Sequence, residues 1–366
     1  MKVADVAELL KQLAPESNAE NFDNVGLLVG DLQAEISSIL ITLDCLDEVV
    51  DEAIQKNCNM IVTFHPIIFS GMKSITGKNY VEKAVIKAIK NDIAIYAIHT
   101  NLDIAKEGVN YEICKRLHIK NSKPLIPKIK SIKKLQTFVP LTHFTQVQHA
   151  LFKAGAGEVG NYKNCSFRVE GTGTFLPTEN SNPFIGKKNV IEEVQEVLIS
   201  VIFEDFKQAT VLEALRRSHP YEEIAYEIFT LDNVNQELGM GRIGELETSL
   251  SQEQFLSFLK ENLPTSCIRH TNLKNKQVKK VAVLGGAGSF AIKNALNAGA
   301  DVFVTADIKY HEFFQAEGKI LLADIGHYES EQFTKNLLHN YLREKLNNID
   351  ILLSEINTNP INYYFK

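Results

Sequence analysis

His327 and Glu331 are the pair of residues in this sequence whose types and spacing point most directly to chemistry. They stand four residues apart after the apolar run 320–323, where a strand is expected to end and a helix to begin. On a helix this spacing puts two side chains one turn apart on the same face. An imidazole and a carboxylate placed in this way are typical of a metal site or of an acid–base pair.

The same spacing recurs at His99 and Asp103, which follow the apolar run 93–98. A further histidine, His65, also follows an apolar run and is succeeded by the rigid Pro66. Two imidazoles and two carboxylates form a ligand set that suits Zn, Mn or Fe(II), and one of the carboxylates could bridge two ions. We therefore predict a divalent metal site with one or two ions per chain. Its predicted ligands are His65, Asp103, His327 and Glu331.

Each of these residues also has an ordinary structural explanation. Glu331 and Asp103 would be favourable in the first turn of a helix whatever their function, and Ser330 is a typical capping residue. A single histidine after a strand, such as His65, is more often structural than a ligand. Capping does not explain why a histidine stands four residues before both acids, so metal binding is the preferred hypothesis. The alternative is a structural role without metal.

Three further polar residues at equivalent turn positions are candidate catalytic residues. They are His99, Asp307 and His311. Each is expected either to fix the tautomer of a metal ligand or to exchange a proton with the substrate. The glycine-rich turn 285–289 could cradle an anion at a helix start, but it lacks the lysine of a nucleoside triphosphate-binding loop. Close packing of the turn explains its glycines at least as well.

The elements that must position these residues form a repeat. Residues 38–65 and 280–307 each read as a strand, a helix and a second strand, and each copy leads on to a further strand that ends near the candidate ligands. Short apolar strands separated by helices indicate a largely parallel sheet, which binds ligands at the carboxyl ends of its strands. We therefore predict an α/β fold in which two repeated α/β halves form one metal-binding domain.

The sequence changes character between the two halves. The Lys- and Pro-rich stretch 122–134 marks a boundary, and beyond it alternating strands and helices favour an inserted ferredoxin-like α+β domain. The predicted domains are residues 1–127 (first half), 128–235 (insert) and 236–366 (second half). Within the insert, the segments 165–175 and 219–226 are candidates for binding a ligand or a neighbouring subunit, with simple turn geometry as the alternative.

The composition excludes several classes of protein. The chain has 366 residues, 45% of them hydrophobic, and a net charge of −6, which is the profile of a globular protein with more than one domain. Without a basic tract it has no strong nucleic-acid signature, and its apolar runs are too short to cross a membrane. Its five scattered cysteines argue against a disulfide framework. The N-terminus does not resemble a signal peptide, so we expect a cytoplasmic protein.

The chain resembles the GTP cyclohydrolase I type II homolog family, also described as NGG-one-interacting-factor-three-like dinuclear metal proteins. The motifs that carry the resemblance are Asp23-Asn24-Val25-Gly26, His65-Pro66, His99-Thr100-Asn101-Leu102-Asp103, Gly285-Gly286-Ala287-Gly288-Ser289 and His327-Tyr328-Glu329-Ser330-Glu331. The resemblance implies a toroidal homohexamer with two metal ions per subunit, the four ligands predicted above, and a PII-like or CutA-like insert. Phe64 departs from the family pattern, because a second histidine usually stands there. Water, His99 or the substrate would then have to complete a second metal position.

These patterns together predict a metal-dependent hydrolase of a nucleotide-like or other small anionic substrate, in which the cation lowers the pKa of a coordinated water. The family name implies ring opening of GTP, although no guanine-reading motif is visible. The alternative is a non-catalytic ring assembly that binds metal and ligand, with the insert acting as a sensor. Whether the protein is an enzyme stays open between these two hypotheses.

Overall fold

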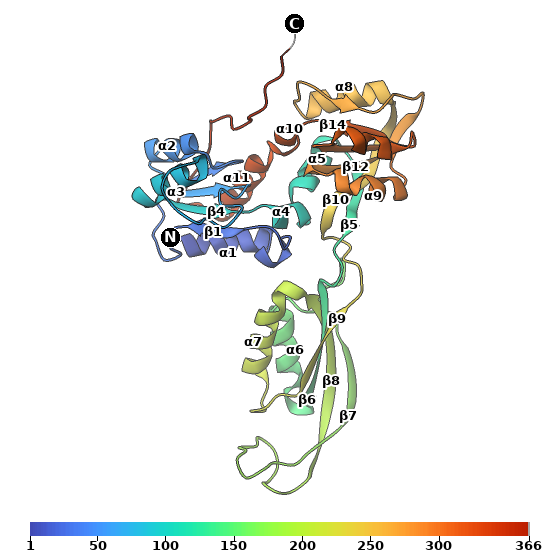
Figure 1. Cartoon of the computed structure of the whole chain (residues 1–366). Coiled ribbons are helices and arrows are strands. Elements are labelled where there is room, and N and C mark those ends of the chain that lie inside the picture. Colours follow the sequence, from blue (N-terminus) through green and yellow to red (C-terminus); the bar gives the residue numbers. More distant parts are fainter. Residues whose placement is uncertain (365–366) are drawn as a thin grey trace. The chain divides into compact units, whose positions relative to one another are not determined.

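The computed structural model describes residues 1–364 and divides the chain into two compact units (Figure 1). One unit combines Met1–Pro127 with the chain from Glu237 onward, and the other is Lys128–Gln236. We call the first the discontinuous unit and the second the inserted unit. In the part of the chain that the structure describes, no helix combines the length and the apolar character needed to cross a bilayer.

The first sheet of the discontinuous unit has five strands in the order β1-β4-β3-β2-β15. Its strands are β1 (Gly26–Val29), β2 (Ser38–Thr42), β3 (Met60–Thr63), β4 (Ala94–Ala97) and β15 (Asp350–Leu353). All run parallel except β1, which pairs antiparallel with β4. The helices of this part are α1 (Val3–Leu13), η1 (Glu16–Asn18), α2 (Asp47–Gln55), α3 (Tyr80–Lys90), α4 (Thr100–Ile104), α5 (Val109–Arg116) and α11 (Thr334–Lys345). Every residue of β2, β3 and β4 is buried, as expected for parallel strands that are covered on both faces.

The second sheet of the same unit has six strands in the order β11-β14-β13-β12-β10-β5. Its strands are β5 (Lys120–Pro127), β10 (Gly239–Ser251), β11 (Arg269–His270), β12 (Gln277–Ala287), β13 (Val302–Ala306) and β14 (Leu321–Asp324). Strands β12, β13 and β14 are parallel, and the other pairings are antiparallel. The helices here are α8 (Gln252–Asn262), η4 (Ser289–Ala291), α9 (Ile292–Asn297), η5 (Tyr310–Ala316) and α10 (His327–Glu331).

The two sheets share one plan. In each, three parallel strands follow one another across the sheet, and the third, β4 or β14, lies beside an antiparallel edge strand. Each third strand leads directly into a short helix, α4 or α10. One apolar core, which includes Ile39, Val62, Val283 and Leu338, packs the two sheets together. This shared core holds the two helix starts in a fixed relation, which a site built from both halves requires.

The second copy of the repeat departs from the expected pattern at its second helix. The first copy has the 11-residue helix α3 between β3 and β4, whereas the second has the seven-residue 3₁₀ helix η5 between β13 and β14. The backbone takes positive φ angles at Asp307, Glu317 and Gly318. These turns bound the seven-residue segment, which folds as a 3₁₀ helix, a geometry used mostly in short segments.

The inserted unit has a four-stranded antiparallel sheet in the order β7-β8-β6-β9. Its elements are β6 (Ile132–Pro140), η2 (Leu141–His143), α6 (Phe144–Lys153), β7 (Phe167–Phe175), β8 (Glu192–Glu204), η3 (Asp205–Lys207), α7 (Gln208–Ser218) and β9 (Tyr226–Leu231). Its core includes Leu135, Leu151, Ile199 and Leu215. Strand β7, which pairs along its whole length with β8, is not predicted by the sequence pattern. Phe167 and Val169 alternate with polar residues only at its start. The Gly- and Thr-rich stretch 171–174 that follows carries no large apolar side chains to mark a half-buried strand.

Candidate metal centre

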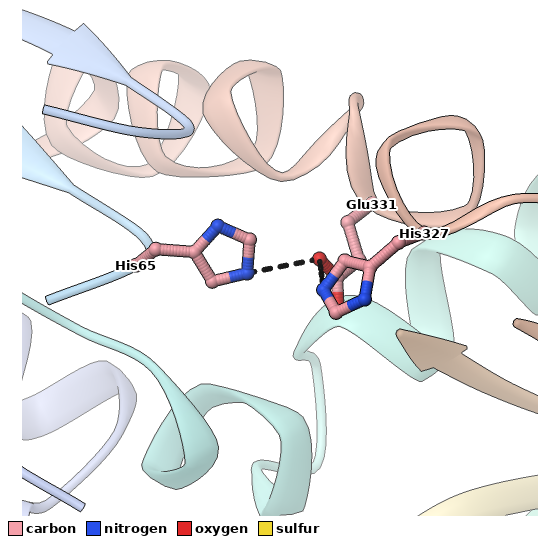
Figure 2. Close-up of side chains that lie close together, drawn as sticks. All are labelled: His65, His327 and Glu331. Atoms are coloured by element: carbon pink, nitrogen blue, oxygen red, sulfur yellow. Dashed lines mark ion pairs between the residues drawn. The ribbon is translucent and has the colours of Figure 1, made fainter. Parts of the chain in front are cut away.

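Three side chains from two distant parts of the sequence converge in the discontinuous unit (Figure 2). One oxygen of Glu331, Oε2, lies 3.1 Å from Nε2 of His65 and 3.2 Å from Nε2 of His327. One ligand atom from each residue falls within 4.8 Å of the others. Figure 2 shows both rings directed at the carboxylate. Ligand atoms that each lie about 2 Å from one ion are roughly 3–4 Å apart, so the distances from Oε2 of Glu331 to the two imidazoles are compatible with a metal site.

His65 is fixed just beyond the end of β3. Its backbone N–H donates to the carbonyl of Leu43 at 2.9 Å, and the hydroxyl of Thr63 donates to its carbonyl oxygen at 3.0 Å. Its Nδ1 lies 2.7 Å from Oδ1 of Asp44. The hydroxyl of Thr358, near the C-terminus, donates to the other oxygen of Asp44 at 2.5 Å. Because Nδ1 is engaged in this way, Nε2 is the nitrogen available to a metal.

His327 and Glu331 are the first and last residues of α10. Gly326 precedes them with a φ of 96°, a left-handed conformation that favours glycine and turns the chain from β14 into the helix. The four-residue spacing then places both side chains on one face. Nδ1 of His327 lies 2.7 Å from Oδ2 of Asp307, so this imidazole also presents Nε2 to Glu331.

The glycine-rich turn at the end of β12 packs against this carboxylate. A Cβ atom at Gly286 would lie 2.3 Å from Oε1 of Glu331, and the φ of Gly286 is +66°. The N–H of Gly286 donates to Oγ of Ser330, and the N–H of Gly285 donates to Oδ1 of Asn110, both at 2.9 Å. These contacts fit the close-packing explanation of the turn rather than an anion cradle.

Asp103, the fourth predicted ligand, is buried in α4 with 9% of its surface exposed. It is not among the three residues whose ligand atoms fall within 4.8 Å of one another. Its Oδ1 is buried and receives no hydrogen bond from the described residues. Burial and the charge of Glu331 raise the pKa of Asp103 well above its usual value. A nearby cation would remove this electrostatic cost, because it would favour the ionised carboxylate.

Hydrogen bonds and charge interactions between the imidazoles and carboxylates shift the pKa values of the cluster. Burial lowers the pKa of His65, but the hydrogen bonds to Asp44 and Glu331 outweigh burial and raise that pKa to about 9. Burial of His327 is outweighed in the same way by Asp307 and Glu331, and its pKa rises to about 11. Burial raises the pKa of Glu331, yet hydrogen bonds from both histidines bring it down to about 2. A metal ion would therefore take the place of protons on the two imidazoles.

The donor set fits a divalent cation. Two imidazole Nε2 atoms face a carboxylate, and each imidazole is held at Nδ1 by a second carboxylate, as is common in transition-metal sites. The unpaired oxygen of Asp103 adds a second acidic group. Two ionised carboxylates balance the charge of one divalent ion. Nitrogen and oxygen donors of this kind serve Zn, Mn and Fe(II) alike.

We expect the affinity for Zn²⁺ to rise with pH. The metal needs unprotonated Nε2 atoms on His65 and His327, and pKa values raised to about 9 and about 11 mean that protons compete with it at neutral pH. Titration calorimetry in buffers of different ionisation enthalpy should therefore detect proton release on binding. An affinity that is equal at pH about 6 and about 8.5, with no proton release, would contradict this assignment.

The stability of the metal-free protein should fall as the pH rises, whereas the metal affinity rises. A histidine whose pKa is raised on folding stabilises the fold fully below its unfolded pKa. For His65 the ordinary pKa is 6.5 and the folded pKa is about 9, so its contribution is lost as the pH rises through that interval. Bound metal should cancel this loss, because it replaces the protons.

A third histidine lies beside the cluster. His99 precedes α4, its ring centroid is 5.2 Å from that of His65, and its Nδ1 is 2.9 Å from Oδ1 of Asp23. Burial raises the pKa of Asp23, but hydrogen bonds from His99 and Thr100 lower it to about 2. The fully buried ring of Phe64 packs against both histidines, with centroid distances of 4.9 Å to His65 and 5.2 Å to His99. An apolar ring therefore packs against both imidazoles, which also contact each other.

The candidate catalytic residues fall in different places. Asp307 contacts His327, and His99 lies beside His65. His311 is not brought into this group, because it is exposed on η5, where it packs against Tyr310 at a centroid distance of 5.1 Å. The short 3₁₀ helix that replaces a regular helix in the second copy carries it on the surface.

Two residues of the site, Asp44 and Asp23, receive no role from the sequence patterns, although Asp23 stands in one of the family motifs. Asp44 had a usable signal, because it is an acid just beyond the end of β2, the parallel neighbour of the strand that leads to His65. Asp23 reaches His99 across 76 residues of sequence, and no local pattern predicts that contact.

Comparisons with known proteins cover nearly the whole chain. The family model Duf34/NIF3 (NGG1p interacting factor 3) matches residues 1–360. The GTP cyclohydrolase 1 type 2 homolog of Halalkalibacterium halodurans is 40% identical over 372 residues, with 99% of this chain and 100% of that protein covered. The protein of the same name from Bacillus subtilis is 37% identical over 363 residues, with 98% and 97% covered. The crystal structure of a Bacillus cereus protein related to NIF3 has a TM-score of 0.87 at 38% identity and covers 100% of this chain and 99% of that one. The chain therefore belongs to the Duf34/NIF3 family.

Proposed function

We propose that this protein is a metal-dependent hydrolase of a nucleotide-like or other small anionic substrate. The observation that carries the proposal is the convergence of Nε2 of His65 and Nε2 of His327 on one oxygen of Glu331. Relatives that share 40% and 37% identity are named GTP cyclohydrolase 1 type 2 homolog, which makes hydrolytic ring opening of GTP the first reaction to test.

The proposed metal ligands are His65, Asp103, His327 and Glu331. Asp44 and Asp307 keep Nδ1 of the two histidines engaged, and so hold each Nε2 toward the ion. A divalent cation bound here would supply Lewis-acid chemistry and lower the pKa of a coordinated water. We propose one or two ions held by these four residues, with Zn, Fe or Mn as candidates. A second ion would lack the imidazole that Phe64 replaces.

His99 is the residue proposed to exchange a proton with the substrate. Asp23 accepts the hydrogen bond from Nδ1 of His99, and its low pKa keeps it charged near neutral pH. This pairing orients the ring. The described residues make no hydrogen bond to Nε2, so this nitrogen is able to take or give a proton. A histidine with a carboxylate at Nδ1 is a common general base in enzymes.

The test is turnover of GTP by the metal-loaded protein, followed as release of formate or of a ring-opened product. We expect His99→Gln to lower kcat by about 100-fold or more, as loss of a general base commonly does, while the metal content stays unchanged. His311→Gln is the matched control, because this histidine is exposed on η5, and it should keep wild-type kcat. Equal activity in both variants would exclude His99 as the base, and absence of any product from GTP would exclude that substrate.

The assembly, the insert and the location of the protein belong to the same proposal. We propose that the protein forms a toroidal homohexamer with the metal sites inside the ring. We also propose that it is located in the cytoplasm. We also propose that the inserted unit is a ferredoxin-like domain of the PII or CutA type. The chain order β6-α6-β7-β8-α7-β9 and the sheet order β7-β8-β6-β9 support this assignment, because a split β-α-β pair gives that order in ferredoxin-like folds.

A second candidate function is a non-catalytic metal- and ligand-binding ring in which the inserted unit senses a small molecule. The position of Phe64 favours this function. Its buried ring packs against His65 and His99, at a place where a further metal ligand would assist catalysis. Stoichiometric metal binding without turnover of any nucleotide tested would favour this function over the hydrolase.

A further inference from the structure

The inserted unit contains a cavity of about 410 Å³, a size typical of small-molecule sites. It is lined from β6, β7, the loop after β7, β8 and the segment after α7. Four aromatic residues contribute to the lining: Phe138, Phe175, Phe184 and Tyr221. Three carboxylates also contribute: Glu196, Glu222 and Glu223. Among the described residues, no lysine or arginine lines this cavity, so the formal charge of the lining is negative.

Glu196 is the central polar group of this cavity. Only 9% of its surface is exposed. Its Oε1 accepts a hydrogen bond from the hydroxyl of Tyr221 at 2.8 Å, while Oε2 receives none from the described residues. Burying a carboxylate is costly unless partners compensate it, and a single phenol is an incomplete set of partners. The free oxygen is therefore able to pair with a ligand.

Gly173 makes room for this carboxylate. A Cβ atom at position 173 would lie 2.1 Å from Oε2 of Glu196. The backbone at Gly173 has no positive φ, so the local conformation does not itself require glycine. The missing side chain instead leaves the space that the carboxylate occupies.

The motif His219-Pro220-Tyr221 orients the phenol that holds Glu196. The N–H of Tyr221 donates to Nδ1 of His219 at 3.1 Å, and Nε2 of His219 donates to the carbonyl of Phe138 at 2.9 Å. Burial lowers the pKa of His219, which keeps the imidazole neutral and adds no positive charge here. Burial and the adjacent Glu196 raise the pKa of Tyr221, so the phenol keeps the proton that it donates.

The rings beside Glu196 form an open aromatic wall. The centroid of Tyr221 lies 6.0 Å from that of Phe175 and 6.5 Å from that of Phe184. Phe184 is 52% exposed although it borders a cavity, so its face is available to a ligand. Aromatic faces attract cations through their quadrupole, and carboxylates attract them by charge, whereas an anionic ligand would meet three carboxylates.

We propose that this cavity binds a small organic cation, either a primary amine or a quaternary ammonium compound. Its positive group would lie against Glu196 and among the rings of Phe175, Phe184 and Tyr221. This proposal is independent of the metal site, since every residue named belongs to the inserted unit.

The test is titration calorimetry of the full-length protein with two cationic probes, choline and putrescine. The control ligand is the neutral carbon isostere of choline, which has the same shape and no charge. We expect at least one of the two cationic probes to bind. If choline binds, we expect its isostere to bind about tenfold or more weakly. Failure of both probes to bind at millimolar concentration would overturn the proposal, as would equal binding of choline and its isostere.

Two variants locate the binding. Glu196→Gln keeps the shape but removes the charge, and Tyr221→Phe keeps the ring but removes the hydrogen bond to Glu196. We expect Glu196→Gln to weaken probe binding about tenfold or more, and Tyr221→Phe to weaken it less. Glu193→Gln is the matched control, because it removes an exposed charge from the same strand. Probe binding that Glu196→Gln and Glu193→Gln affect equally would overturn the proposal. Circular dichroism and an unchanged metal content would show that the variants fold.

Discussion

Replacing Glu331 with alanine should abolish the stabilisation that a divalent cation gives to the wild-type protein. Its Oε2 is the one atom that lies within 3.2 Å of Nε2 of both His65 and His327 in the cluster, and its side chain is 3% exposed. Zn²⁺ at about 100 times its dissociation constant should stabilise the wild type by about 2.7 kcal/mol. The variant should show almost none of this effect, because the carboxylate between the two imidazoles is gone.

The measurement is thermal unfolding of chelator-treated protein with and without Zn²⁺ or Mn²⁺. Glu344→Gln serves as the control, because this glutamate is exposed on α11. It should respond to metal as the wild type does. A metal-dependent shift in Tm of equal size in Glu331→Ala and Glu344→Gln would mean that the cation binds elsewhere.

Replacing Gly286 with alanine should damage both the fold and the metal site. The new Cβ would lie 2.3 Å from Oε1 of Glu331, and the backbone at this position has a φ of +66°. Left-handed backbone at a residue other than glycine costs about 1–3 kcal/mol, and the clash adds to that cost. We therefore expect a lower free energy of unfolding in metal-free buffer, together with weaker metal binding, because Glu331 must move away from the histidines.

Denaturant unfolding without metal and a metal titration measure the two effects separately. Gly71→Ala is the matched control, because no atom lies within 4 Å of its Cβ position and its φ is not positive. This variant should keep wild-type stability and affinity. A Gly286→Ala protein with wild-type metal affinity would contradict the assigned contact between the glycine turn and Glu331.

The parts of the structure that the sequence predicted are those with local patterns. The spacing of His327 and Glu331 comes directly from helix geometry, and the two side chains meet on α10 at 3.2 Å. The apolar runs before His65 and His99 correspond to β3 and β4, because parallel strands that are buried on both faces are apolar throughout. The equivalence of these strand ends is what suggested one shared site.

The parts that could not be predicted depend on contacts between distant residues. Asp44 and Thr358 are 314 residues apart, and together they hold His65 in place. The need for glycine at position 286 becomes visible only when Glu331 is seen beside it. Strand β7 is exposed along most of its length and is defined by its pairing with β8. Sequence patterns report local geometry, whereas these features arise from tertiary packing.

The most direct test of the metal site is elemental analysis of the protein purified without chelator or affinity metal, beside the double variant His327→Ala, Glu331→Ala. The proposal predicts one or two divalent ions per chain in the wild type and none in the double variant. Absence of metal from both proteins, or equal metal content in the two, would contradict it.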